Sequence, residues 1–222
     1  MATKTIPIVK EILSANDQVA LENNMLLKAS DVFALNLMAS PGAGKTTFIL
    51  ATHARLPKGV TAGVIEGDLA SSIDADKMAA HGLPVVQINT GGGCHLDAPM
   101  IRTALASLPL DDINLLFIEN VGNLVCPANF KLGSHLNVVV SSVPEGHDKP
   151  YKYPTIFAAA DVVILNKADM IEVFEFDVDY FRRGVEVVNP TVPVLAVSGK
   201  TGDGIDAWIE WLLRQKNRHS GQ

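Results

Sequence analysis

A glycine-rich turn with one lysine and two threonines joins an apolar run to a helix-forming run in the stretch LNLMASPGAGKTTF, residues 35–48. Such a strand-to-helix turn aims backbone N–H groups and the positive end of the helix at one place, which suits nucleotide phosphates. Lys45 would reach the β- and γ-phosphates, and the Thr46 hydroxyl would bind Mg²⁺. The usual pattern opens with glycine where this chain has Ala39. The predicted nucleotide-binding residues of this turn are Gly42, Ala43, Gly44, Lys45, Thr46 and Thr47.

The segment Asn166-Lys167-Ala168-Asp169 follows an apolar run and resembles the N-K-x-D motif of GTPases. Asp169 would accept hydrogen bonds from the N1–H and 2-amino groups of guanine, whereas adenine offers neither donor. A site built for such donors rejects an analogue that lacks them by about 10⁴–10⁵. Asn166 would brace the loop, and the stem of Lys167 would lie over the purine. A polar turn that caps a helix is the alternative interpretation.

A second loop is expected at the base, because GTPases place an S-A-K-like segment after the next strand. This chain has Ser198-Gly199-Lys200 at that place. The segment would contact guanine through its backbone. Together the two loops predict a preference for GTP over ATP.

Two acidic segments, Glu66-Gly67-Asp68 and Glu119-Asn120-Val121-Gly122, lie where predicted strands end. Phosphoryl transfer needs Mg²⁺ held, the γ-phosphate oxygens neutralised and a water aligned. Asp68 and Glu119 are the candidates for the Mg²⁺ and water contacts, and with Lys45 they form the predicted catalytic set. The N–H of Gly122 would sense the γ-phosphate. Either acid could instead cap a helix or lie solvated at the end of a loop.

Two cysteines and a histidine form a second candidate site. Cys94 and His95 lie in the loop TGGGCHLDA, and Cys126 lies in the loop ENVGNLVCPA. Thiolate and imidazole ligands suit Ni²⁺, Zn²⁺ and copper. Three ligands on one chain leave a metal site incomplete, so a symmetric dimer that pools two sets is the natural completion. Buried, inert thiols are the alternative.

Short apolar runs that alternate with helical stretches must position these loops. Strands are expected over 33–39, 60–66, 84–89, 114–119, 136–142, 161–165 and 192–197, and crossover helices over 45–56, 72–81 and 97–108. The pattern predicts an α/β phosphate-loop NTPase with a mainly parallel sheet of about seven strands and helices on both faces. Ligands of such sheets bind beyond the carboxyl ends of the strands, where each of these motifs falls.

Composition limits the partners and the location of the protein. The 222 residues carry a net charge of −6 and no long run of lysine or arginine, so nucleic acid is not an expected partner. Neither a signal peptide nor an apolar run of about 20 residues is read in the sequence, so we expect a cytoplasmic protein that lies outside the membrane. The length suits a single G domain over 1–222, with a helical element over 1–30 packed on it.

Five segments of the chain stand out together, namely EGD 66–68, GCHLDA 93–98, ENVGNLVCPA 119–128, EGHDKPYKYP 145–154 and NKAD 166–169. They resemble the HypB family of GTPases, which assist nickel insertion into [NiFe]-hydrogenase. The resemblance runs from about residue 30 to the C-terminus. It implies a GTP-favoured homodimer and a metal site made of Cys94, His95 and Cys126. It further implies a HypA-like nickel chaperone and a hydrogenase large-subunit precursor as partners, and a contact of Lys149 with the dimer interface and the nucleotide. Slow GTP hydrolysis is expected from the residues themselves, because no arginine or glutamine is placed as a catalytic finger.

Three other functions compete with this interpretation. Urease accessory GTPases share the phosphate loop but use a Cys-Pro-His motif, whereas this chain has Cys126-Pro127-Ala128. An accessory GTPase of cobalamin enzymes would not require the cysteines. A nickel store with a vestigial nucleotide site would not need an intact Lys45 and Asp169. A Cys-rich or His-rich N-terminal nickel motif of some family members is missing from this sequence.

Overall fold

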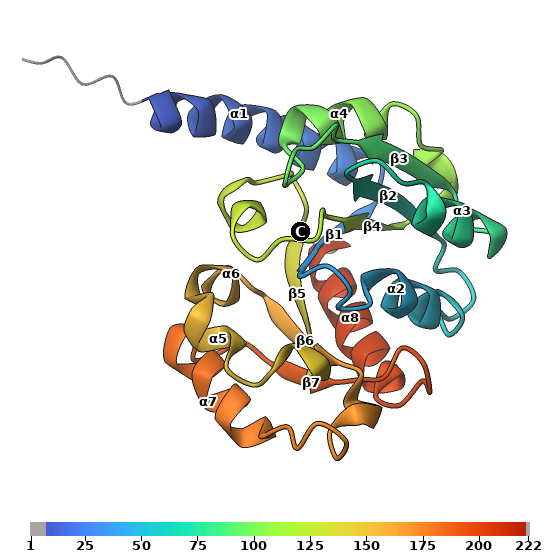
Figure 1. Ribbon diagram of the computed structural model, residues 1–222. Helices are drawn as coiled ribbons and strands as arrows, with labels where there is room; N and C mark the ends of the chain where they lie inside the picture. The colour runs from blue at the N-terminus through green and yellow to red at the C-terminus, as the bar shows by residue number, and fades with distance from the viewer. Residues whose placement is uncertain (1–7, 221–222) are drawn as a thin grey trace, which may run out of the picture.

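The computed structural model describes residues 8–220, and its centre is a seven-stranded sheet in the order β3-β2-β4-β1-β5-β6-β7 (Figure 1). All six neighbouring pairs are parallel, so the predicted, mainly parallel sheet is in fact wholly parallel among the described residues. Every predicted strand is found, with its ends within two residues of the expected ones. The strands are β1 Phe33–Ala39, β2 Ala62–Asp68, β3 Val85–Asn89, β4 Leu115–Glu119, β5 Leu136–Ser142, β6 Val162–Asn166 and β7 Val194–Ala196.

The end of β2 differs from the prediction. The acidic segment 66–68 was expected in the loop after a strand over 60–66, but it forms the last three residues of the strand itself. Strands on both sides extend the hydrogen-bonded ladder, because Glu66 is in register with Glu119 of β4, and Asp68 with Asn89 of β3. The acids are therefore held on rigid backbone.

Helices cover both faces of the sheet. On one face, Phe48 and Trp208 pack with the side chains of Leu35 and Leu37. On the other face, α1 and α4 cover the β2–β4 half, and α6 and α7 cover the β5–β6 half. The helices are α1 Ile8–Ala29, α2 Lys45–His53, α3 Ile73–Ala80, α4 Ala98–Leu105, α5 Lys149–Lys152, α6 Pro154–Ala158, α7 Val178–Val188 and α8 Ile205–Ser220.

The long first helix lies beside α4 at the top of Figure 1 and is fixed there by buried amide groups. Asn23 donates to the carbonyl oxygens of Ala98 and Leu132 at 2.9 and 3.0 Å. The side-chain oxygen of Asn16 accepts from Ala98 N–H at 2.9 Å. A single G domain over 1–222 stays a prediction, and residues 1–7 of its N-terminal element lie outside the described part. Among the described residues, no helix combines the length and apolarity needed to span a membrane.

Candidate nucleotide and metal site

The phosphate loop lies between β1 and α2, in the middle of the sheet. Gly44 is the residue before the helix, and it has the left-handed φ of +92° that glycine adopts at little cost. A Cβ atom at Gly44 would lie 2.7 Å from the side-chain nitrogen of Asn166. Glycine is therefore required here both by backbone conformation and by the close approach of the loop that follows β6.

Lys45 and Thr46 begin α2 and both point into the protein at Glu119, the last residue of β4. The Thr46 hydroxyl donates to Glu119 Oε1 at 3.0 Å, and Lys45 Nζ lies 3.9 Å from the same oxygen. Burial raises the pKa of Glu119 to about 7, although the lysine charge and the threonine hydrogen bond act in the opposite direction. Three predicted residues, two from the start of α2 and one from the end of β4, thus meet in one buried cluster.

The acids of β2 behave differently from each other. Asp68 turns back on its own loop, where Oδ1 accepts from the N–H groups of Ala70 and Ser71 at 2.9 and 2.8 Å. These bonds lower the pKa of Asp68. Glu66 is 2% exposed, and burial together with the nearby Glu119 charge raises its pKa to about 8. The strand therefore carries one readily ionised acid and one that resists ionisation.

The side chains around Glu119 suit the Mg²⁺ that accompanies a nucleotide. Mg²⁺ takes hydroxyl and carboxylate oxygens in a small octahedral shell. Thr46 and Glu119 bring one of each into contact. Glu119 Oε2 is buried and has no hydrogen-bond partner among the described residues, so the site lacks one positive or donating group. These donors fit the ion.

A cavity of about 440 Å³ opens beside the phosphate loop, where the loops after β6 and β7 meet. Lys167 donates to the Gly42 carbonyl at 2.7 Å, and Asn166 donates to the Ala43 carbonyl at 2.9 Å. Both bonds hold the loop after β6 against the phosphate loop. Asn166 Oδ1 also accepts from Gly199 N–H at 3.1 Å. The predicted nucleotide-binding residues that line the cavity are Gly44, Thr47, Asn166, Lys167, Asp169, Gly199 and Lys200.

Two predicted residues lie apart from this cavity. Ser198 is fully buried, and its hydroxyl accepts from Thr201 N–H at 3.1 Å, so it shapes the loop from below. Lys149 lies at the start of α5, with Nζ 5.2 Å from the centre of the Tyr153 ring. The nucleotide contact that was predicted for Lys149 has no counterpart in the cavity lining.

Gly122 lies in direct contact with the phosphate loop. A Cβ atom on this residue would lie 2.9 Å from both Cα and N of Pro41. The loop that follows β4 thus approaches the phosphate loop more closely than any larger residue allows. This placement suits the predicted sensing of a γ-phosphate.

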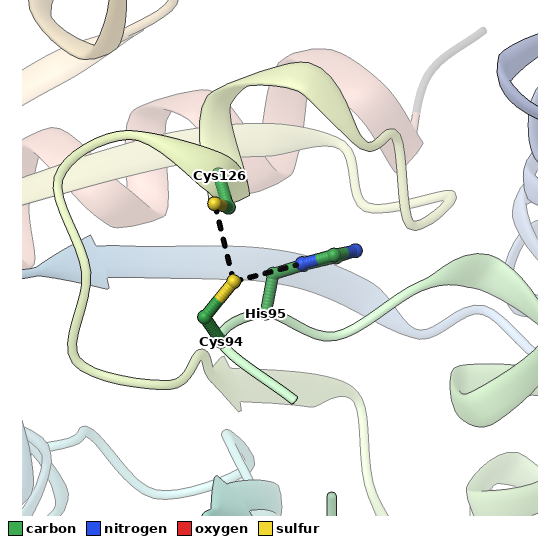
Figure 2. Close-up of side chains that lie close together, drawn as sticks. All are labelled: Cys94, His95 and Cys126. Carbon is green, nitrogen blue, oxygen red and sulfur yellow. Dashed lines mark hydrogen bonds between the residues drawn. The ribbon is translucent and has the colours of Figure 1, made fainter. Parts of the chain in front are cut away.

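Figure 2 shows the three predicted metal ligands with their ligand atoms facing one another. These atoms all lie within 4.8 Å of one another. Cys94 Sγ is 3.2 Å from Cys126 Sγ and 3.6 Å from His95 Nδ1. Cys94 and His95 come from the loop after β3, and Cys126 starts a short 3-10 turn over 126–129. Two loops whose cysteines lie 32 residues apart in the chain therefore make one cluster.

The surroundings of this cluster set its protonation. The hydrogen bond with Cys126 raises the pKa of the Cys94 thiol, because it favours the protonated form. Burial lowers the pKa of His95, whose ring stacks on Phe130 with centroids 3.9 Å apart. A neutral imidazole is the form that binds a metal ion, and an incoming divalent ion would displace the thiol protons. The cluster is open to solvent through Cys94, which is exposed.

Several residues of the site had no role in the sequence interpretation. Glu66 belongs to the acidic segment 66–68, but only Asp68 of that segment was given a role. Asn120 and Asn123 lie inside a segment that was singled out only for its glutamate, glycine and cysteine. The remaining ones come from loops that only the folded chain brings together, namely Phe130 at the metal cluster and Pro144, Met170 and Phe174 at the base cavity.

Comparison with known proteins identifies the family of this chain. The CobW/HypB/UreG nucleotide-binding domain matches residues 33–196. The hydrogenase maturation factor HypB of Escherichia coli (strain K12) is 47% identical over 206 residues, which are 93% of this chain and 71% of that protein. The hydrogenase/urease maturation factor HypB of Helicobacter hepaticus is 43% identical over 223 residues, covering 99% of this chain and 91% of that protein.

A solved structure has the same fold over most of the chain. The crystal structure of HypB from Helicobacter pylori in complex with nickel has a TM-score of 0.89 and 40% identity, over 93% of this chain and 97% of that one. This match confirms the predicted phosphate-loop NTPase fold, and the relatives confirm the resemblance found in the sequence. The chain belongs to the HypB family, within the CobW/HypB/UreG group of nucleotide-binding proteins.

Proposed function

We propose that this protein hydrolyses GTP and uses the nucleotide cycle to control delivery of nickel during maturation of [NiFe]-hydrogenase. The observation that carries the proposal is the cluster of two thiols and one imidazole within 4.8 Å. It lies in loops that follow the carboxyl ends of β3 and β4, and the phosphate loop follows the carboxyl end of β1 in the same sheet. The names of the relatives from Escherichia coli and Helicobacter hepaticus support the hydrogenase assignment. The nickel in the Helicobacter pylori structure supports the choice of metal.

The nucleotide is proposed to be GTP. Asp169 lines the cavity beside the phosphate loop, as a carboxylate that reads guanine must. The loop carrying it is braced by Asn166 and Lys167 onto the backbone that would hold the phosphates. The same hydrogen bonds thus fix the base-binding loop and the phosphate loop relative to each other.

Hydrolysis is assigned to the cluster around Glu119. Lys45 would neutralise the γ-phosphate oxygens, and Thr46, Asp68 and Glu119 would hold Mg²⁺ and orient a water molecule. Bound Mg²⁺ would supply the positive charge that phosphoryl transfer requires. We expect turnover well below the roughly 10 s⁻¹ of a median enzyme, because no arginine or glutamine lies in the acidic switch segment 119–122.

Nickel is the proposed cargo of Cys94, His95 and Cys126, with zinc as the competing ion. Two thiols and one imidazole leave a four-coordinate ion one ligand short. A second copy of the chain would complete the site, so a GTP-favoured homodimer is proposed, with Lys149 near its interface. A HypA-like chaperone would supply the ion and a hydrogenase large-subunit precursor would receive it. We place this work in the cytoplasm, where cysteines stay reduced.

Urease maturation is the second candidate function, because the Helicobacter hepaticus relative is named for both enzymes. Deletion of the gene in its host separates the two candidates. Loss of hydrogenase activity that added nickel restores, with urease activity unchanged, supports the hydrogenase role. Loss of urease activity alone would favour the second candidate.

The linkage of metal and nucleotide is tested on the purified protein. Nickel chloride is titrated in the presence of Mg²⁺ with GDP and, separately, with a non-hydrolysable GTP analogue. We expect the nickel dissociation constants to differ by about 5–150-fold, as in typical coupled systems. Equal affinity and stoichiometry in the two nucleotide states would contradict a GTP-controlled transfer.

A further inference from the structure

The loop after β3 carries the ligands Cys94 and His95 and is the metal loop of this protein. One buried side chain, that of Asn120, joins it to the loop after β4. This residue is 0% exposed. Its Oδ1 atom accepts from Leu96 N–H at 3.1 Å and from Val121 N–H at 3.0 Å. Leu96 directly follows the ligand His95, and Val121 directly precedes Gly122. A single oxygen atom therefore holds the backbone of both loops.

Asn123 makes a second connection from the same loop. Its backbone N–H donates to the carbonyl of Ala39, the last residue of β1 before the phosphate loop, at 2.7 Å. Its side-chain amide donates to the carbonyl of Cys94 at 3.1 Å, and its Oδ1 accepts from Val125 N–H at 2.8 Å. Asn123 thus contacts the phosphate-loop strand, the metal loop and the residue before Cys126.

The two contacts on the metal loop flank a ligand. Asn123 holds the carbonyl of Cys94, and Asn120 holds the N–H of Leu96, so the backbone on each side of His95 is fixed. The side chain of Leu96 is fully buried, and a Cβ atom on Gly67 would lie 2.7 Å from it. The metal loop is therefore also seated on the acidic end of β2.

The anchoring continues into the core of the sheet. Asn120 Nδ2 donates to Asn36 Oδ1 at 3.1 Å, and Asn36 Nδ2 donates to Asn137 Oδ1 at 3.1 Å. Asn36 lies on β1, and Asn137 lies on β5. A buried amide that loses its partner is costly, so displacement of the loop after β4 must either break these bonds or carry the metal loop with it.

We propose that Asn120 and Asn123 are positioning residues that transmit the nucleotide state from the loop around Gly122 to the ligands Cys94 and His95. The inference rests on the proposed function and extends it. The path leads across the sheet to the loop after β3, in addition to the short chain connection from Gly122 to Cys126. Nucleotide and metal affinity would then be linked through two identified side chains.

Asn123 is the better residue for the test, because it is half-buried and its removal leaves the core intact. Asn123→Ala deletes the bond to Cys94. Asn123→Asp keeps an acceptor for Val125 N–H but has no donor for the Cys94 carbonyl. The matched control is Asn114→Ala, since Asn114 also donates to one loop carbonyl and accepts from one loop N–H, at the opposite end of β4.

The measurement is the ratio of nickel dissociation constants with GDP and with the non-hydrolysable GTP analogue, in the presence of Mg²⁺. In both Asn123 variants we expect the ratio to fall toward one, with nucleotide affinity and the urea midpoint close to those of the unmodified protein. Asn114→Ala should keep the unmodified ratio. In the converse titrations, the ratio of analogue affinity to GDP affinity must change by the same factor when nickel chloride is added.

Three results would overturn the inference. If both Asn123 variants keep the ratio of the unmodified protein, these bonds do not transmit the nucleotide state. If nickel binding weakens equally in both nucleotide states, Asn123 only supports the loop. If the ratio of nickel dissociation constants falls to one in Asn123→Ala but stays unchanged in Asn123→Asp, the hydrogen bond to the Cys94 carbonyl does not transmit the nucleotide state. A ratio of one in the unmodified protein would instead contradict the proposed function itself, and the inference with it.

Discussion

Glu66 of β2 and Glu119 of β4 are register partners on adjacent strands, and both side chains are almost completely buried. In each, the Oε2 atom has no hydrogen-bond partner among the described residues. Lys45 approaches Glu119 at 3.9 Å and is the positive group of this cluster. Burial raises the pKa of Glu66 to about 8, and the nearby Glu119 charge acts in the same direction. Burial also raises the pKa of Glu119 to about 7, although the Lys45 charge lowers it.

The first prediction concerns the stability of the nucleotide-free protein. An unfolded chain loses the Glu66 proton near its ordinary pKa of 4.5, whereas the folded protein keeps the proton up to about pH 8. The stability contributed by this group is therefore fully present below pH 4.5 and is lost as the pH rises to about 8. Glu66→Gln should raise the free energy of unfolding by about 1–3 kcal/mol at about pH 8.5 and change it little at about pH 5.

Urea unfolding at the two pH values checks this prediction. The control is Glu172→Gln, because Glu172 is exposed and lies in the turn before α7. It should leave the unfolding free energy unchanged at both values. A Glu66→Gln variant that is less stable at high pH would mean that the carboxylate is satisfied in the folded protein and that its pKa is not raised.

The second prediction concerns the base. Asp169→Asn should shift the preference from GTP to XTP, because the amide can donate to the 2-oxo group of xanthine but meets a donor in guanine. The preference for GTP over XTP should fall by up to the roughly 10⁴-fold that such hydrogen bonds provide. Competition binding with GTP, XTP and ATP measures it, with Asp179→Asn on the surface of α7 as the control. An unchanged GTP preference would remove Asp169 from the base site.

The strands of this fold could be predicted because each is an apolar run with a definite end. The phosphate loop could be predicted because its glycines, lysine and threonines are contiguous. Their spatial order could not be derived in the same way, since β4 lies between β2 and β1 only through long-range pairing. That pairing places Glu66 opposite Glu119, and it explains why the role of Glu66 was missed.

The hydrogen bonds that connect the nucleotide and metal sites could not be predicted from the sequence for the same reason. Asn120 and Asn123 are ordinary polar residues in a loop, and nothing in their spacing marks Leu96 or Cys94 as their partners. The metal ligands were easier to predict, because two cysteines in glycine- and proline-containing loops suggest a metal site by type alone. Local chemistry can be predicted from sequence, whereas hydrogen bonds between distant loops require the folded structure.

The third prediction concerns the metal. Cys94→Ala and Cys126→Ala should each weaken nickel binding about tenfold or more, which is about 1.4 kcal/mol, because each removes one of the three ligands that cluster among the described residues. His81→Ala serves as the control, since His81 is exposed at the end of α3. Nickel titration followed by the thiolate-to-metal absorption band measures both affinity and ligand type. Full affinity in either cysteine variant would contradict the three-ligand site.

The last prediction concerns Gly122. An alanine at this position would place Cβ 2.9 Å from the backbone of Pro41, which cannot yield as a flexible side chain can. The loop after β4 must then move away from the phosphate loop and carry its N–H groups with it. Gly122→Ala should therefore weaken binding of a non-hydrolysable GTP analogue by about tenfold or more, while GDP, which has no γ-phosphate, should bind almost as before.

Gly63→Ala provides the matched control for crowding. An added Cβ at Gly63 would meet the side chain of Ile113 at 2.8 Å, near the start of β2 and away from the nucleotide loops. It should lower stability and leave the ratio of GTP-analogue to GDP affinity unchanged. If Gly122→Ala weakens GDP and the analogue equally, the residue shapes the phosphate loop as a whole and does not distinguish the two nucleotides. If only the analogue is affected, the close approach of Gly122 to Pro41 is the contact through which the protein reads a γ-phosphate.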